Sequence, residues 1–143
     1  MPYQYLDDIA LADVAFKAEG KTPEEMFLAA ADATLNVMVE DLDDIFGKQK
    51  RRIHVEDESL EMLLVSTLQE LIYYKDAQGL LLRLTKANIL KQNGIYTFSG
   101  EARGEKIIRG QHKLNTDVKA VTLHRLRVTE TANGWEAVVV LDV

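Results

Sequence analysis

Two aspartates stand at the ends of strongly apolar segments, one near each end of the chain. Asp13 opens the stretch DVAF, and Asp142 follows VVVL, directly before Val143. A carboxylate placed in apolar strand sequence is costly to bury unless a partner neutralises it, so it either stays in water or binds something. If the two segments are neighbouring antiparallel strands, the start of one lies beside the end of the other, and the two carboxylates converge.

Converging carboxylates favour a divalent ion. Two carboxylates at close range repel, so one of them takes up a proton unless a cation lies between them. Calcium suits such a place because it accepts oxygen ligands at about 2.3–2.6 Å, and Val143 adds a further source of oxygen. The sequence therefore predicts a metal site made of Asp13, Asp142 and Val143, with calcium as the expected ion and magnesium as the alternative. The simpler interpretation is that both aspartates are solvated strand ends.

The other chemistry-bearing residues give weaker patterns. The three histidines, His54, His112 and His124, lack the spacing of zinc ligands on a helix or strand, and the chain has no cysteine. His124 falls in VKAVTLHRL, on one face of a predicted strand, where a lone histidine is more often a hydrogen-bonded structural residue than a ligand. A glycine-rich phosphate loop and a Gly-x-Ser-x-Gly nucleophile elbow are both absent from the sequence, which argues against independent nucleophilic catalysis.

Composition predicts one globular domain spanning residues 1–143. Hydrophobic residues make up 47% of the chain, enough for a core. The longest apolar runs are far too short for a transmembrane helix, and MPYQYLDD at the N-terminus does not read as a secretory signal. With no cysteine in the chain, these features lead us to expect a cytoplasmic protein.

The net charge of −6 disfavours tight, autonomous binding to nucleic acid. Two local basic stretches run against this balance, KQKRR (48–52) and RGEKIIRGQHK (103–113). Each could be a docking patch, or simply a set of solvated charges in turns and on edge strands.

Local signals place the elements that must position these residues. Residues 13–20 read as a strand, and a helix follows with Thr22 as N-cap, Pro23 at its first position and Glu25 completing a capping box. A second helix with a leucine-rich stripe is predicted over 57–79, with Gly79 past its end. Further strands are predicted over 51–55, 80–90, 95–101, 105–110, 120–129 and 135–142.

Asn-Gly pairs in KQNG (91–94) and TANG (131–134) predict two hairpins. Because strands follow one another directly toward the C-terminus, we expect an α+β fold in which two main helices pack on a mostly antiparallel sheet, rather than a parallel βαβ arrangement.

Several segments together resemble the archease family. They occur in the family's order and cover most of the chain: LADVAFKAEGKTPEEMFLAAADATLNVM, SLEMLLVSTLQELIYYKDAQGLLL, SGEARGE, and VKAVTLHRLRV followed by GWEAVVVLDV. The resemblance implies an α+β accessory protein of the GTP-dependent tRNA-splicing RNA ligase. Such a factor promotes guanylylation and multiple turnover of the ligase, broadens its use of nucleoside triphosphates, and carries a divalent-ion site in which calcium is expected.

The resemblance also assigns residues. The family's N-terminal acid, in a His-Thr-Ala-Asp motif, falls on Asp13 in ALAD, and its C-terminal acid falls on Asp142, with backbone or terminal oxygens from Val143. The motif's histidine is missing here, and its space falls to Asp7 or Asp8, so Asp8 is a candidate supporting residue. His124 matches the family's Lys-Ala-x-Thr-x-His run and is a second candidate for support.

The sequence thus favours a non-enzymatic accessory factor whose partner is the ligase and which contacts tRNA only weakly or through the ligase. Two alternatives stay open. One is a metal-dependent phosphoester hydrolase that uses Asp13, Asp142 and His124. The other is an RNA-binding or chaperone-like module that uses the basic stretches 48–52 and 103–113.

Overall fold

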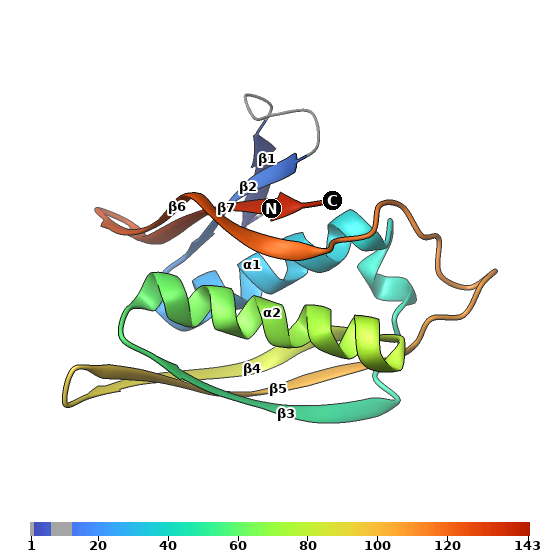
Figure 1. Ribbon diagram of the computed structural model, residues 1–143, viewed down its shortest axis with the longest axis horizontal. Helices are drawn as coiled ribbons and strands as arrows, with labels where there is room; N and C mark the ends of the chain where they lie inside the picture. The colour runs from blue at the N-terminus through green and yellow to red at the C-terminus, as the bar shows by residue number, and fades with distance from the viewer. Residues whose placement is uncertain (1, 7–12) are drawn as a thin grey trace.

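Two helices lie between two antiparallel sheets in the computed structural model of the chain (Figure 1). The structure describes residues 2–6 and 13–143. One sheet has four strands in the order β1-β2-β7-β6, and the other has three in the order β3-β5-β4. The elements are β1 (Tyr3–Leu6), β2 (Asp13–Gly20), α1 (Pro23–Met38), the short 3₁₀ helix η1 (Leu42–Asp44), β3 (Gln49–Asp57), α2 (Leu60–Gln78), β4 (Leu80–Gln92), β5 (Ile95–Lys106), β6 (Ala120–Thr131) and β7 (Gly134–Asp142).

The expected α+β class, with two helices on antiparallel strands, is confirmed. The structure adds that the strands divide into two sheets and that both helices are shared between them. α1 contacts β2 and β7 of one sheet and β4 of the other, while α2 contacts β3, β4 and β5 on one side and β6 on the other. Each helix is therefore buried on opposite faces, and the core fills the middle of the molecule. Within the described part of the chain, no helix is long and apolar enough to cross a membrane.

The first helix begins where its capping residues predict. Thr22 has extended backbone angles, and its Oγ1 accepts a hydrogen bond from the Glu25 N–H at 3.1 Å, while Pro23 occupies the first turn. In a strict capping box the Glu25 carboxylate would accept from the N–H of the N-cap residue, Thr22. Here it accepts instead from the N–H of the preceding residue, Lys21, at 2.7 Å. On its buried side Phe27 stacks on Phe98 of β5, with ring centroids 5.7 Å apart.

Replacing the cap residue should weaken the fold measurably. Thr22→Ala removes the side-chain acceptor for an otherwise unpaired helical N–H, so we expect a loss of about 1 kcal/mol in the free energy of unfolding. Chemical denaturation measures it. Thr116→Ala, at an exposed loop position, is the matched control and should change stability by less than about 0.5 kcal/mol. Equal effects of the two variants would contradict the capping role.

The second helix starts later than predicted, at Leu60 rather than Asp57. Asp57 is the last residue of β3, and Ser59 is the N-cap, with its Oγ accepting from the Met62 N–H at 3.1 Å. The far end is as predicted: Gly79 has φ 66° and its N–H bonds to the Lys75 carbonyl at 2.9 Å. A left-handed conformation of this kind favours glycine.

Two differences concern the strands. The predicted strands 95–101 and 105–110 are wrong as separate elements: β5 runs without interruption to Lys106, after which the chain leaves the sheet. Gly104 pairs with both Gln49 of β3 and Leu82 of β4, so the strand continues through it. Glycine is required at this position because a Cβ would collide with the carbonyl of Leu81. The sequence pattern also missed β1, a short edge strand paired with β2.

Both predicted hairpins form. Asn93 and Gly94 take φ values of 53° and 76° and join β4 to β5, which fits the tight turn that an Asn-Gly pair favours. Gly134, with φ 141°, begins β7 after the turn from β6. A residue with a Cβ at this position would press on the backbone of Gly20 and Lys21, and its backbone would be strained at this φ value.

Candidate functional site

The sheet register brings Asp13 and Asp142 together. Asp13 of β2 lies directly opposite Asp142 of β7, and Ala120 of β6 lies on the other side of Asp142. Residues directly opposite one another in an antiparallel pair project to the same face, with Cβ atoms about 4.5–5.5 Å apart. The two aspartates, called the carboxylate pair below, are both half-buried.

The carboxylate pair lies on the face of the four-stranded sheet that is turned away from the helices. Phe16 and Val139 face one another on the inner side, where they join the core, so their neighbours Ala15 and Val140 face outward. Ala15 and Val140 are nevertheless almost fully buried, at 1% and 0% exposed. The carboxylate pair thus borders a dry apolar row, where charges interact more strongly than in water.

The backbone at this end of β7 is held from both sides. The carbonyl of Asp142 accepts a hydrogen bond from the Lys119 N–H at 2.8 Å, where the chain enters β6. The N–H of Val121 donates to Gln69 Oε1 at 2.6 Å, which ties the start of β6 to α2. Because β7 is flanked by β2 and β6, the position of Asp142 is set by the sheet rather than by a loop.

The donor chemistry of the carboxylate pair fits a hard divalent ion such as calcium or magnesium, which takes oxygen ligands. The side chain of Val143 is half-buried against the core, and the main-chain oxygen of Val143 stays a predicted ligand. Residues 2–6 and 13–143 hold no group of three or more His, Cys, Asp or Glu side chains that could bind a metal. An ion bound by the carboxylate pair would therefore use further oxygens from the chain, water or a partner.

The structure does not bring His124 beside the carboxylate pair. The register of β6 against β7 shifts between Thr122 and Arg127, and His124 lies exposed within this irregular stretch. Its N–H bonds to Thr122 Oγ1 at 3.2 Å, and the next residue, Arg125, has φ 55°. The regular strand alternation expected here is broken, and His124 has no partner in the β6–β7 register, whereas Ala120 lies opposite Asp142. A supporting role for it stays a prediction, and Asp8 lies outside the described residues.

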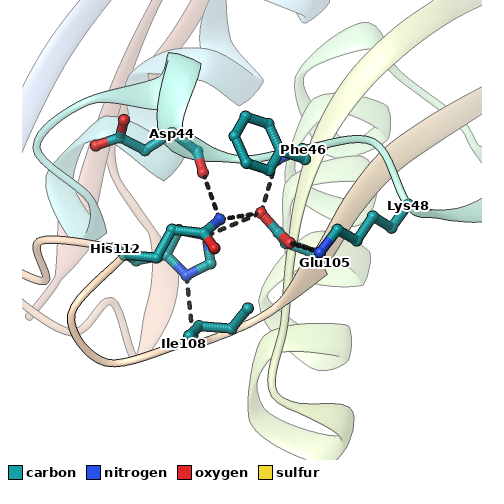
Figure 2. A network of polar contacts seen from close by, with 7 residues as sticks. Asp44, Phe46, Lys48, Glu105, Ile108 and His112 are labelled. Atoms are coloured by element: carbon teal, nitrogen blue, oxygen red, sulfur yellow. Dashed lines mark hydrogen bonds and ion pairs between the residues drawn. The ribbon is translucent and has the colours of Figure 1, made fainter.

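A buried polar network that sequence reasoning missed centres on Glu105 (Figure 2). Glu105 and His112 are only 2% and 4% exposed. One carboxylate oxygen of Glu105 accepts hydrogen bonds from the Phe46 N–H at 2.7 Å and from Gln111 Nε2 at 2.6 Å. His112 Nε2 lies 3.1 Å from the same oxygen. These four residues, with Lys48 and Ile108, form the Glu105 network.

The remaining contacts show which nitrogen of the His112 ring carries the hydrogen. The Ile108 N–H donates to His112 Nδ1 at 2.9 Å, so Nε2 carries the hydrogen and donates it to Glu105. Lys48 Nζ lies 3.4 Å from the second oxygen of Glu105. Because both ring nitrogens are engaged, His112 ties the loop after β5 to the sheet, and the arrangement is structural rather than that of a free base.

The network keeps Glu105 ionised despite its burial. The N–H of Phe46 contributes most to holding the pKa of Glu105 below its usual value, and burial opposes it by raising the pKa. His112, Lys48 and Gln111 lower the pKa further. The sequence offered little to reveal this cluster, because Phe46 and Glu105 are 59 residues apart. Within the basic stretch 103–113, Glu105, Gln111 and His112 therefore belong to a structural network and not to a docking patch.

The lowered pKa of Glu105 makes its contribution to stability depend on pH. A carboxyl group with a lower pKa when folded stabilises the fold above its unfolded pKa, about 4.3, and loses this effect as the pH falls through the folded pKa. We expect the stability difference between wild type and Glu105→Gln to be largest near neutral pH and to shrink below about pH 4. Denaturation across pH measures it, with the exposed Glu130→Gln as control. A difference independent of pH would contradict this role.

Comparison with known proteins gives a consistent result over the whole chain. The model of the Archease protein family (MTH1598/TM1083) matches residues 3–143. Protein archease of Methanosarcina barkeri is 41% identical over 142 residues, covering 99% of this chain and 95% of the relative. Protein archease of Pyrococcus furiosus is 38% identical over 133 residues, covering 92% and 93%.

Solved structures agree with the fold. The solution structure of Methanobacterium thermoautotrophicum protein 1598 superimposes with a TM-score of 0.85 at 30% identity and covers 99% of both chains. A Thermotoga maritima crystal structure, described as an archease and possible chaperone, gives a TM-score of 0.61 at 18% identity, covering 96% of this chain and 97% of that one, and is similar in fold.

Proposed function

Because this chain belongs to the archease family, we propose that it is an accessory factor of the GTP-dependent tRNA-splicing RNA ligase. It promotes guanylylation and repeated turnover of the ligase in the cytoplasm and broadens the range of nucleoside triphosphates that the ligase uses. The observation that carries this proposal is the placement of Asp13 directly opposite Asp142 on an outward sheet face. These two positions carry the acids that the family resemblance assigns to ion binding.

The carboxylate pair supports the proposal through its charge. Guanylylation brings a triphosphate to a nucleophile, and a bound divalent ion supplies positive charge that offsets the phosphate oxygens. In this chain Asp13 and Asp142 would hold that ion, and the sheet on both sides of β7 keeps their spacing fixed. Rigid positioning matters because small displacements of groups at a reacting centre are costly.

Two modes of action are consistent with the geometry. The protein could place its carboxylates, with their ion, at the ligase active site. Alternatively, it could bind one conformation of the ligase preferentially and so shift the ligase toward the state that is ready for the next cycle. The first mode requires the acids of the carboxylate pair, whereas the second requires only the surface around them.

The proposal is tested by counting product molecules per ligase. Ligase, cleaved tRNA halves and GTP are incubated with or without the purified chain, with the RNA in large excess. Stimulation above one product per ligase, present only when the chain is added, is the expected result. Unchanged ligase turnover would contradict the proposal, and release of phosphate or nucleotide by the chain alone would favour the metal-dependent hydrolase instead.

A further inference from the structure

The two basic stretches of the sequence meet on the outer face of the three-stranded sheet. In the register of β3 against β5, Lys50 lies opposite Arg103, and Arg52 lies opposite Glu101. From the other side β4 places Lys86 opposite Glu101. The four cations Lys50, Arg52, Lys86 and Arg103 are all exposed and are called the basic face below.

The alternation of the strands separates this face from the core. Ile53, Phe98 and Ala102 are buried against the helices, at 2%, 0% and 0% exposed, so the residues between them face outward. Arg51 shows the same rule from the other side: its guanidinium lies 5.9 Å from the ring centre of Tyr74 in α2. The side chains of KQKRR therefore alternate between the two faces of the sheet, and only Lys50 and Arg52 contribute to the basic face.

One carboxylate, that of Glu101, lies among the cations of the basic face. Glu101 accepts from Arg103 Nε at 2.5 Å and lies 3.9 Å from the ammonium groups of both Lys50 and Lys86. Its pKa is lowered, chiefly by the hydrogen bond from Arg103. Beside it lies a shallow hollow of about 490 Å³, whose lining includes Lys50, Arg52, Lys86, Asn88, Ser99 and Glu101.

The charge of this hollow stands in contrast to that of the chain as a whole, whose net charge is −6. A polyanion is repelled by the molecule on average and attracted to this face, so it would bind in one orientation. The donors are of the kinds that contact phosphate oxygens: ammonium, guanidinium, hydroxyl and amide groups. The centre of a protein interface is depleted of charged residues, whereas Lys50, Arg52, Lys86 and Glu101 all line this hollow.

We propose that the basic face binds the phosphate backbone of RNA without reading its sequence. The inference rests on the proposed function in one respect, namely that the RNA would be the tRNA on which the ligase acts. Because the helices lie between the two sheets, the basic face and the carboxylate pair point to opposite sides of the molecule (Figure 1). The chain can thus engage the ligase with one sheet and the RNA with the other.

The test uses the isolated full-length chain and fluorescently labelled tRNA, with binding followed by anisotropy at about 50 and 200 mM salt. We expect weak binding, with a Kd of about 1–100 μM at physiological salt that tightens as salt is lowered. Arg52→Glu should weaken binding about fivefold to tenfold, and Arg52→Ala should reduce the salt slope by about one. Glu101→Gln removes the competing carboxylate and should tighten binding.

The matched control is Lys21→Glu, which makes the same change of charge at an exposed site between β2 and α1. It should leave RNA affinity unchanged. Circular dichroism and thermal melting establish that each variant is folded. If Arg52→Glu does not fold, Arg52→Ala is used in its place. Equal effects of Arg52→Glu and Lys21→Glu, or a loss of affinity in Glu101→Gln, would overturn the inference.

The same variants separate this inference from the proposed function. If the chain stimulates the ligase but fails to bind tRNA at low salt, the inference is wrong and the proposed function stands. If it binds tRNA through the basic face but leaves ligase turnover unchanged, the proposed function is wrong and the RNA-binding face stands. If Arg52→Glu weakens binding to RNA-free ligase while tRNA affinity is unchanged, the occupant is an acidic protein surface, which also overturns the inference.

Discussion

Asp142→Asn is expected to reduce ligase turnover to the level seen without this protein, while the variant stays folded. Asparagine keeps the size and polarity of the side chain but removes the charge that opposes Asp13 across the β2–β7 register. A neutral amide beside a single carboxylate is a much poorer ligand set for a hard divalent ion. In the absence of metal the variant should be slightly more stable than wild type, because a repulsion between two carboxylates is relieved.

The loss is measured as the number of products per ligase, with wild-type and variant protein added at equal concentration. Asp44→Asn, which removes a carboxylate from η1 instead, is the control and should stimulate like wild type. The same loss is expected for Asp13→Asn, since both members of the carboxylate pair are needed. Full stimulation by a folded Asp142→Asn protein would exclude the mode in which the carboxylates act at the ligase, leaving only a surface-binding role.

Leu68→Ala is expected to have the largest effect on the fold itself. Leu68 lies in the middle of α2, which contacts both sheets, and its side chain is fully buried. Removing its methyl groups leaves a cavity that the surrounding elements can fill only in part, so the free energy of unfolding should fall by roughly 2–5 kcal/mol. Chemical denaturation measures the loss.

The control for Leu68 is Leu90→Ala, which makes the same change at a side chain that is 62% exposed. It should cost less than about 0.5 kcal/mol. If Leu68→Ala also costs less than about 0.5 kcal/mol, the packing of α2 between two sheets is not what stabilises the protein.

Features with a local physical cause could be predicted from the sequence. Thr22 caps α1 because its side chain bonds the N–H of a residue three positions on, and Gly79 ends α2 because glycine tolerates a left-handed backbone. The tight turn at Asn93 and Gly94 depends on two adjacent residues. The convergence of the carboxylate pair could be predicted on the condition that the two apolar segments are neighbouring antiparallel strands, and the β2–β7 register meets that condition.

Features that depend on distant pairing could not be predicted. Nothing local in β3, β4 and β5 indicates that they form a sheet separate from β2, β6 and β7. The irregular stretch around His124 follows from its register against β7, and a strand pattern read along the chain predicts a regular face instead. The Glu105 network is likewise non-local, since the backbone N–H that donates to Glu105, that of Phe46, comes from the segment after η1.

Calorimetric titration of the isolated chain with calcium tests the central claim most directly, because it needs neither ligase nor RNA. We expect one ion to bind per wild-type chain, with binding lost in Asp13→Asn and in Asp142→Asn and retained in Asp44→Asn, and with magnesium competing for the same site. Calcium binding that persists when both members of the carboxylate pair are changed, or wild-type protein that binds no divalent ion, would contradict this claim.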